Sequence, residues 1–427
     1  MISAAQVSGL AAGLSAGLAR WRSARAVHDP GKVVLDLAIS LAAGGDCLAD
    51  IAVARAQPEL FGAVASDPTV SRLVEVLAAD PDAAIEVLAG VRAAAREKVW
   101  AGQSPIAETG PVVVDIDATL VGSHSDKESA APNFKRGFGF HPLLTFVDHG
   151  PGGTGEPLAG LLRAGNAGSN TAADQIAVID AAIAQLPEKA RSRVLVRADS
   201  AGGTKNVLGH LTEANVAYSV GLTAHDPVDA ALASLPRQAW RAAINADGSA
   251  REGAQVAELT RWMPASFRRK WPARMRVIVR RERPHVGAQL RLTDIDGWRT
   301  TVFATNVTGG RLPELERNHR LRARAEDRIR NLKDTGLTNL PFHEFAKNRI
   351  WLELVQLAGE LLTWTQLLAW THHPARTWEP KTVRLRILAV AARLVTTSRR
   401  RILRISKKWP WADLILAGHH RLTASFP

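Results

Sequence analysis

Cysteine is nearly absent from this sequence, because Cys47 is the only one in 427 residues. A disulfide framework and a cysteine-based zinc site are therefore excluded within the chain, which fits a reducing cytosol. No charge-free apolar stretch reaches the roughly 18 residues that a transmembrane helix needs. Residues 1–23 lack the positively charged start of a secretory signal. We therefore expect a cytoplasmic protein that does not enter a membrane.

Acidic residues are too few to balance the basic ones. The chain has 54 Lys and Arg against 41 Asp and Glu, so its formal net charge is +13 and its pI is about 10.5. Such a surplus favours a polyanionic partner, with nucleic acid first and an anionic membrane second. The alternative is compositional, because a GC-rich genome favours Ala, Arg and Gly.

Residues 1–105 carry apolar residues at helical spacing. Ser66, Asp67, Pro68 and Thr69 form a helix-start signal between two of the amphipathic stretches. A compact helical domain that contains a DNA-binding helix-turn-helix fits this pattern. A purely structural helical bundle fits it equally well.

The pattern changes at residue 111. Residues 111–222 read as three strands, a helix, a strand, a helix and a strand, which predicts an α/β layer architecture. Residues 223–310 favour β-strands, with turn signals between them. An arginine-rich helix at 319–336 and a long apolar helix at 343–370 follow, and residues 384–409 are the most basic part of the chain.

Three positions on this pattern carry candidate catalytic acids. Asp115 and Asp117 lie on one face of the first strand, because strand side chains alternate with period two. Buried acids are costly unless they are paired or bound to metal, so an open site is expected there. Asp199 ends the strand at 193–199, and ligands usually bind at such strand ends. The third candidate, Glu326, stands among five arginines of the helix at 319–336.

The helix at 319–336 presents a polar face. His319, Arg322, Glu326 and Lys333 fall within roughly 60° of one another at 3.6 residues per turn. A solvated amphipathic helix with ordinary i,i+4 ion pairs explains the same spacing. Three carboxylates from distant parts of the chain, however, are the ligands that hard cations such as Mg²⁺ prefer. Two such ions can stabilise both the attacking and the leaving oxygen of a phosphoryl transfer, while Arg and Lys hold the phosphodiester backbone.

These residues resemble the signature of a known family. His319, Arg322, Glu326 and Lys333 resemble the Tyr-Arg-Glu-Lys signature of DDE insertion-sequence transposases, with all three spacings intact. The strand "VVVDIDATL" resembles the first catalytic motif of that family and "VLVRADSAGG" resembles the second. The stretches "GFHPLL", "LRAGNAGSNTAADQI" and "DRIRNLKDTGLTNLPF" resemble an actinobacterial-type branch. The resemblance covers about residues 30–375.

The resemblance implies an α/β RNase H-like core, a mixed sheet flanked by helices, with a β-rich insertion between the second and third acids. An N-terminal helical domain and a helical, basic C-terminal region complete the expected architecture. The predicted domains are a helical DNA-binding domain at 1–105, the first part of the core at 106–222, the β-rich insertion at 223–310, the second part of the core at 311–375 and the basic helical region at 376–427.

The resemblance also implies site residues. Asp117, Asp199 and Glu326 would be catalytic and hold two Mg²⁺ ions, with Mn²⁺ as a substitute, and Asp115 stays open as an alternative first ligand. The DNA-binding residues implied are His319, Arg322, Lys333 and Trp298. Two departures stand out, since His319 replaces the usual Tyr and Ala118 the usual Gly. Trp298 is the candidate for stacking on a flipped base, and packing within a hairpin is the alternative.

The implied function is a transposase of the bacterial cytoplasm, associated with the nucleoid. It would bind the terminal inverted repeats of its element as a homodimer, cut the double-stranded DNA at the ends through hairpin intermediates and join 3′-OH ends to target DNA. A degenerate transposase that binds DNA as a repressor without catalysis is the rival hypothesis. A host RNase H-like nuclease would not need the β-rich insertion, and a membrane-surface role for residues 384–409 is a further alternative.

Overall fold

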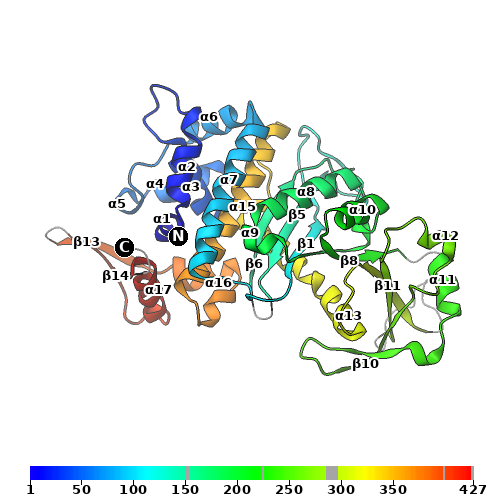
Figure 1. Cartoon of the computed structure of the whole chain (residues 1–427). Coiled ribbons are helices and arrows are strands. Elements are labelled where there is room, and N and C mark those ends of the chain that lie inside the picture. Colours follow the sequence, from blue (N-terminus) through cyan, green and yellow to red (C-terminus); the bar gives the residue numbers. More distant parts are fainter. Residues whose placement is uncertain (151–152, 224–225, 285–296, 398–399, 425–427) are drawn as a thin grey trace.

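The computed structural model describes all residues except 151–152, 224–225, 285–296, 398–399 and 425–427. Among the described residues, nine strands form one mixed sheet (Figure 1). In spatial order they are β6 (Gly155–Leu161), β5 (Leu143–Asp148), β1 (Val112–Ala118), β7 (Val194–Ala198), β8 (Ala217–Leu222), β12 (Arg299–Thr305), β11 (Arg276–Glu282), β10 (Ala250–Glu258) and β9 (Arg241–Ile244). A small second sheet beside the carboxyl end of β1 contains β2 (Val121–Gly122), β4 (Phe138–Phe140) and β3 (Ala131–Pro132).

The direction of the strands divides the large sheet. β1 pairs antiparallel with β5 and parallel with β7, and β7 pairs parallel with β8. The remaining pairings, from β8 through β12 to β9, are antiparallel. The mixed sheet is consistent with the expected RNase H-like core. The β-rich insertion does not form a separate layer, however, because β12 pairs directly with β8 and continues the same sheet.

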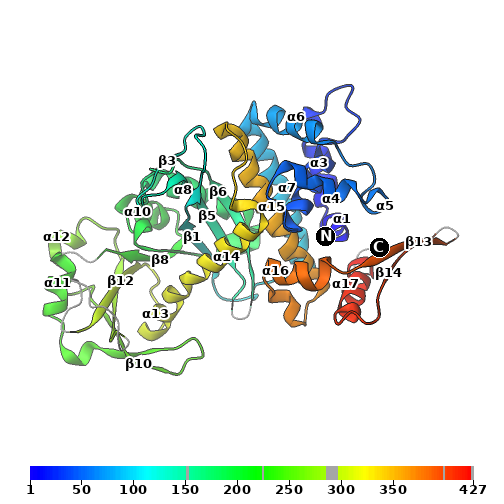
Figure 2. The ribbon, with the colours of Figure 1, turned by 180° about the vertical axis from the view of Figure 1, so that it is seen from behind.

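Helices cover both faces of the sheet. α8 (Ala172–Gln185) and α10 (Lys205–Glu213) lie in front of it in Figure 1, and α14 (Arg324–Leu332) lies on the opposite side in Figure 2. α15 (Phe345–Ala369) packs against β6 and is buried along nearly its whole length. Further elements are α9 (Glu188–Arg191), α11 (Asp226–Ala233), α12 (Ala265–Arg268) and α13 (Leu312–Arg320). In the described ranges, every helix is too short or too polar to cross a bilayer.

The N-terminal helices wrap around α15. They are α1 (Ile2–Val7), α2 (Leu10–Gly17), α3 (Pro30–Ala42), α4 (Ala52–Arg55), α5 (Pro58–Phe61), α6 (Asp67–Ala78) and α7 (Pro81–Gly102). Local signals set their ends: Asp29 caps α3 by accepting hydrogen bonds from the backbone N–H groups of Gly31 and Lys32. The predicted start of a helix at Ser66–Thr69 is confirmed by α6. Their apolar side chains belong to the same hydrophobic core as the sheet, so no break in the core separates residues 1–105 from the rest.

A buried ion cluster joins α7 to α15 and β6. Arg92 donates to Glu353 at 2.6 Å and to Glu360 at 2.8 Å, and Arg96 donates to Glu156 at 2.9 Å and also to Glu360. The side chains of Arg92, Arg96, Glu156 and Glu360 are 0–1% exposed. Trp100 and Trp364 each donate their indole N–H to Glu156 at 2.7 Å. The carboxylates of Glu156 and Glu360 therefore accept hydrogen bonds on both oxygens. Loss of one cation would leave buried negative charge unpaired.

The C-terminal region differs from its prediction. Residues 376–427 were expected to be helical. Among the described residues of this region, the helical segments are the end of a 3-10 turn (Pro374–Thr377), α16 (Pro380–Val383), a short π-helical turn at Arg384–Leu388 and α17 (Ala412–Ala424). Between them β13 (Ala392–Thr397) and β14 (Arg400–Ile405) form an antiparallel two-stranded sheet. The helical prediction is therefore wrong for residues 392–397 and 400–405. The reason lies in the β-branched residues Val395, Thr396, Thr397, Ile402 and Ile405, which favour strands over helices.

Replacing Arg96 by Ala should destabilise the fold by about 3–5 kcal/mol, because Glu156 and Glu360 would share one fewer cation in a dry environment. Urea denaturation of Arg96→Ala and wild type measures the loss. The matched control is Arg311→Ala, which removes an exposed i,i+3 pair with Glu314 and should leave stability unchanged. Equal stability of Arg96→Ala and wild type would show that the cluster does not hold α7 in place.

Candidate active site

Adjacent strands bring two of the candidate acids to one edge of the sheet. Asp117 is close to the carboxyl end of β1, and Asp199 directly follows β7. The two strands run parallel, and the register pairs Ile116 with Ala198, so Asp117 and Asp199 are the next residues on neighbouring strands. The carboxyl ends of parallel strands are where α/β sheets bind their ligands.

The third acid reaches this edge from a helix. α14 packs across β1 and β5 and carries Glu326 in its first turn. Burial, together with the charges of Asp199 and Glu326, raises the pKa of Asp117 to about 6, against the attraction of Arg322. The three carboxylates are therefore electrostatic neighbours. They are not in contact, since one oxygen from each does not fall within 4.8 Å of the other two.

Cations do not neutralise this group of acids. Among the described residues, none of the ion pairs includes Asp117, Asp199 or Glu326. Asp117 and Asp199 accept only backbone N–H groups, from Ala118 at 2.8 Å and Ala201 at 2.9 Å. The two acids border a pocket of about 130 Å³, which Phe134, His141 and Gln175 also line. Two carboxylates that border a pocket, with the charge of a third acting on Asp117, are the kind of oxygen ligands that a hard divalent cation prefers.

Asp115 has a different environment from Asp117. It is 2% exposed and accepts two hydrogen bonds from Arg197, both 2.7 Å long. Arg197 also donates to Asp148 at 2.9 Å, and Asp148 accepts from Arg324 of α14 at 3.1 Å. Burial raises the pKa of Asp115 to about 6, against the attraction of Arg197. These contacts support Asp115 as a partner of Arg197 that positions the strands, and they leave Asp117 as the acid that faces the pocket.

Sequence reasoning missed the residues of this network. Asp148 is 8% exposed, and although burial raises its pKa, Arg197 and Arg324 hold that pKa below the usual value. Arg197 occupies a strand position whose neighbours are all apolar. A lone arginine in a buried strand is the only signal that could have indicated a buried partner.

The signature helix is not continuous. α13 ends at Arg320, a 3-10 turn covers Leu321–Ala323, α14 covers Arg324–Leu332, and a π-helical turn covers Lys333–Leu337. The prediction of one regular helix over 319–336 is therefore wrong in its middle. Gly336, the last residue of the predicted helix, has a φ of 108° inside the π-helical turn. The four signature residues therefore lie on separate segments, with His319 in α13, Arg322 in the 3-10 turn, Glu326 in α14 and Lys333 in the π-helical turn.

His319 lies in the core rather than on the polar face. It is 3% exposed, its ring stacks on Phe303 with centroids 4.3 Å apart, and its Nδ1 lies 3.0 Å from the Ser219 hydroxyl. Burial lowers its pKa well below 6.5, so the imidazole is neutral near pH 7. A DNA phosphate does not reach a side chain enclosed in this way. The predicted DNA contact of His319 therefore disagrees with its buried position. The His319 side chain instead holds α13 against β8 and β12.

The other two signature cations lie nearer the acids. The charge of Arg322 acts on both Asp117 and His319, as their pKa shifts show. Lys333 is half-buried and donates to the carbonyl oxygen of Leu120 at 3.3 Å, just beyond β1. Burial lowers the pKa of Lys333, and the nearby charge of Lys135 lowers it further. Lys135, in the loop between β3 and β4, is thus a second cation that sequence reasoning missed.

Trp298 is half-buried at the start of β12. The guanidinium carbons of Arg281 and Arg283 lie 4.7 Å from the centre of its ring, and Arg281 also lies 3.9 Å from the ring of Trp240. These contacts favour the hairpin-packing alternative for Trp298, because cations already cover its ring. The first part of the predicted strand before it, residues 288–296, lies outside the described residues.

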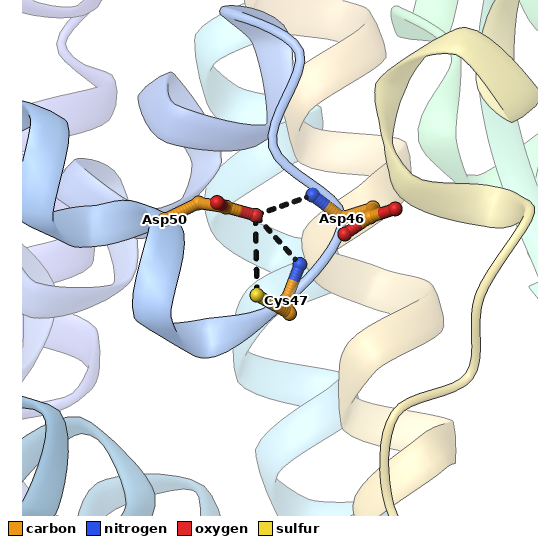
Figure 3. Close-up of side chains that lie close together, drawn as sticks. All are labelled: Asp46, Cys47 and Asp50. Carbon is orange, nitrogen blue, oxygen red and sulfur yellow. Dashed lines mark hydrogen bonds between the residues drawn. The ribbon is translucent and has the colours of Figure 1, made fainter.

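A second acidic group is found far from this site in the sequence. Among the described residues, Asp46, Cys47 and Asp50 are the group whose potential ligand atoms lie within 4.8 Å of one another (Figure 3). One oxygen of Asp50 accepts hydrogen bonds from the backbone N–H groups of Asp46 and Cys47 and from the Cys47 thiol. Burial and Asp50 raise the pKa of that thiol. The group is explained by capping of the turn at Leu48–Ile51.

The fold and the site define a class of enzyme that acts on nucleic-acid phosphodiesters, with acids at the strand ends of a mixed sheet and cations beside them. Within that class, the chain matches the family model "Transposase DDE domain group 1" over residues 1–426, and it belongs to this family. It is therefore a DNA transposase. No curated protein matches the chain. A similar solved structure is "Cryo-EM structure of piggyBac transposase synaptic complex with hairpin DNA", with 8% identity, a TM-score of 0.40 and coverage of 89% of this chain and 77% of that one.

Replacing Asp117 by Asn should stabilise the metal-free protein at pH 7.5, by at most about 3 kcal/mol. The folded-state pKa of Asp117 lies near 6, above its ordinary 3.8. The ionised carboxylate therefore costs stability above pH 6, and this cost disappears as the pH falls from about 6 toward 4. Urea denaturation in EDTA at pH 7.5 and at about pH 4 measures the difference in stability between Asp117→Asn and wild type. The control is Asp126→Asn at an exposed acid, and an equal or lower stability of Asp117→Asn at pH 7.5 would contradict the prediction.

Proposed function

We propose that this transposase binds the terminal inverted repeats of its element, cleaves the DNA at the element ends and joins the 3′-OH ends to target DNA. Asp117, Asp199 and Glu326 would hold two Mg²⁺ ions for this reaction. One observation carries the proposal: Asp117 of β1, Asp199 directly after β7 and Glu326 of α14 lie near one edge of the sheet, where the charges of Asp199 and Glu326 act on Asp117. The membership in a DDE transposase family supports it.

The acids would serve as ligands because the three carboxylates lie near one edge of the sheet. Bound divalent cations supply Lewis-acid stabilisation of the attacking and leaving oxygens in phosphoryl transfer. The chain itself holds the three acids in position. Arg324 of α14 is tied through Asp148 to Arg197, so the helix that carries Glu326 is fixed relative to β1 and β7. This pre-organisation keeps the three ligands at a constant separation while DNA enters.

Cations around the acids would hold the DNA. Arg322 and Lys333 are the signature cations that we assign to phosphates near the cut, and Lys135 joins Lys333 there. The guanidinium and ammonium groups of these residues would contact DNA phosphates whatever the DNA sequence is. We assign end recognition to residues 1–105 and to the basic C-terminal region. His319 would act by positioning α13, because it is neutral and enclosed.

The assembly and the course of the reaction extend this proposal. Two DNA ends must be handled together, which favours a homodimer, and the resemblance to the Tyr-Arg-Glu-Lys class implies cut-and-paste transposition through hairpin ends. The action on chromosomal DNA places the protein at the bacterial nucleoid. A repressor without catalysis would retain the basic surfaces but would not need Asp199 and Glu326 beside Asp117.

Glu326→Gln should reduce cleavage by more than about 100-fold, the upper loss seen for outer-shell partners of metal ligands, and leave DNA affinity unchanged. The substrate is a labelled duplex that carries the element end, incubated with Mg²⁺, Ca²⁺ or EDTA. The control is Asp327→Asn, at an exposed acid beside Glu326 that pairs with Arg330.

Cutting that depends on Mg²⁺ and is lost only in Glu326→Gln supports the proposal, and hairpin products on the element end support the cut-and-paste route. Cleavage by Glu326→Gln at the wild-type rate would remove Glu326 from the site. Tight binding without cutting by wild type in every metal would favour the repressor.

A further inference from the structure

A two-stranded ribbon projects from the C-terminal region. We define the basic ribbon as the two strands β13 and β14, residues 392–397 and 400–405, which pair from Ala392 with Ile405 to Thr397 with Arg400. The two strands form a sheet of their own and extend away from the body, beside α17, in both views (Figures 1 and 2). A two-stranded sheet alone is marginally stable in water, so its position calls for a partner.

The chain segment that leads into the basic ribbon is anchored next to Lys333 of the signature. Arg384 donates to the carbonyl oxygen of Asp334 at 2.7 Å, and Lys381 pairs with the Asp334 carboxylate at 2.9 Å. Asp334 follows Lys333 in the segment that also carries Glu326. Beyond the ribbon, the Trp409 indole N–H donates to the carbonyl oxygen of Arg386 at 2.9 Å. The two ends of the ribbon are therefore fixed on one side, while its strands extend outward.

Like charges face each other on the basic ribbon. Arg393 and Arg404 are direct cross-strand partners, so their side chains lie on the same face. In the part of the chain that the structure describes, neither pairs with an acid. Directly opposed like charges destabilise a strand pair, and an anion between them removes the repulsion. Residues 384–409 contain nine Lys and Arg and no Asp or Glu, so no acid of this segment can supply that anion.

Apolar side chains accompany these cations. Ile402, on the face of Arg393 and Arg404, is 41% exposed, and Leu403, on the opposite face, is 47% exposed, although both are large and hydrophobic. A strand of six residues spans about 20 Å, and the major groove of DNA, about 12 Å wide, admits a two-stranded ribbon. Exposed apolar groups flanked by arginines suit a groove that has base edges at its floor and phosphates at its rims.

We propose that the basic ribbon binds duplex DNA in a groove, with Arg393 and Arg404 at the phosphates. This inference rests on the proposed function, since it names the surface that holds the DNA during the reaction. A second copy of the chain is a poorer occupant, because pairing of two ribbons would bring the same cations together and the whole chain carries a net charge of +13. The chain segment before the ribbon contacts Asp334, which directly follows Lys333. DNA bound to the ribbon would therefore lie on the side of the molecule where the chain runs from Glu326 to Asp334.

The test is fluorescence-anisotropy binding of a labelled duplex to the full chain in Ca²⁺, at salt from about 50 to 200 mM. The first variant is Arg393→Ala with Arg404→Ala. The second replaces residues 392–405 by a short Gly-Ser linker, which the adjacent ends at Ala392 and Ile405 allow. The control is Lys189→Ala with Lys270→Ala, which removes two exposed cations outside the ribbon and outside residues 1–105. Urea denaturation checks that all variants fold.

We expect the double arginine variant to bind several-fold more weakly and its slope of log K against log salt to fall by about 2, since each phosphate contact contributes about 0.9. The linker variant should lose at least as much, and the control should bind like wild type. Wild-type affinity and salt slope in both ribbon variants would overturn the inference while leaving the proposed function intact. Absence of duplex binding by wild type would overturn both.

Two other outcomes would also contradict the proposal that the basic ribbon binds duplex DNA. If the linker variant keeps wild-type DNA affinity but sediments as a smaller species, the ribbon binds a second copy of the chain. If the ribbon variants keep DNA affinity but lose binding to phosphatidylglycerol vesicles, the ribbon is a membrane contact.

Discussion

The guanidinium group of Arg197 connects the parts of the molecule on which the candidate site depends. It binds Asp115 of β1 and Asp148 of β5, and it donates to the carbonyl oxygen of Asn318 in α13 at 2.8 Å. Asp148 in turn binds Arg324, at the start of α14. Planar, bidentate geometry suits arginine for this role, and lysine could not replace it. The network thereby sets the distance between the strands that carry Asp117 and Asp199 and the helix that carries Glu326.

The paired and unpaired acids of β1 illustrate two uses of buried charge. Asp115 is enclosed and satisfied by Arg197, whereas Asp117, two residues further on, is half-buried and accepts only a backbone N–H. Its pKa near 6 records that the fold tolerates an unfavourable carboxylate there. Perturbed acids of this kind concentrate at functional sites, because the fold supports them with stable surroundings. The ion cluster around Arg92 and Arg96 is part of that support, since it fixes α7 and α15 behind the sheet.

Most regular elements and the identity of the candidate acids could be predicted from the sequence. The strands β1, β5, β7 and β8 and the helices α8, α10 and α15 follow from local periodicity, which nearby residues determine. The break between α13 and α14 could not be predicted, because helical spacing continues through residues 321–323. The enclosure of His319 depends on Phe303 and Ser219, which are distant in the chain. Lys135 joins Lys333 only because the small sheet beside β1 places its loop there.

The sequence by itself determined the alternation of strands and helices, the acids at strand ends, the surplus of basic charge and the resemblance to DDE transposases. Tertiary structure decided that Asp115 pairs with Arg197 while Asp117 faces a pocket, that the β-rich insertion extends the main sheet, and that residues 392–397 pair with residues 400–405 in a ribbon. The physical reason is that local pattern fixes backbone conformation and the face on which a side chain lies. Burial, charge pairing and pKa depend on neighbours that only folding brings together.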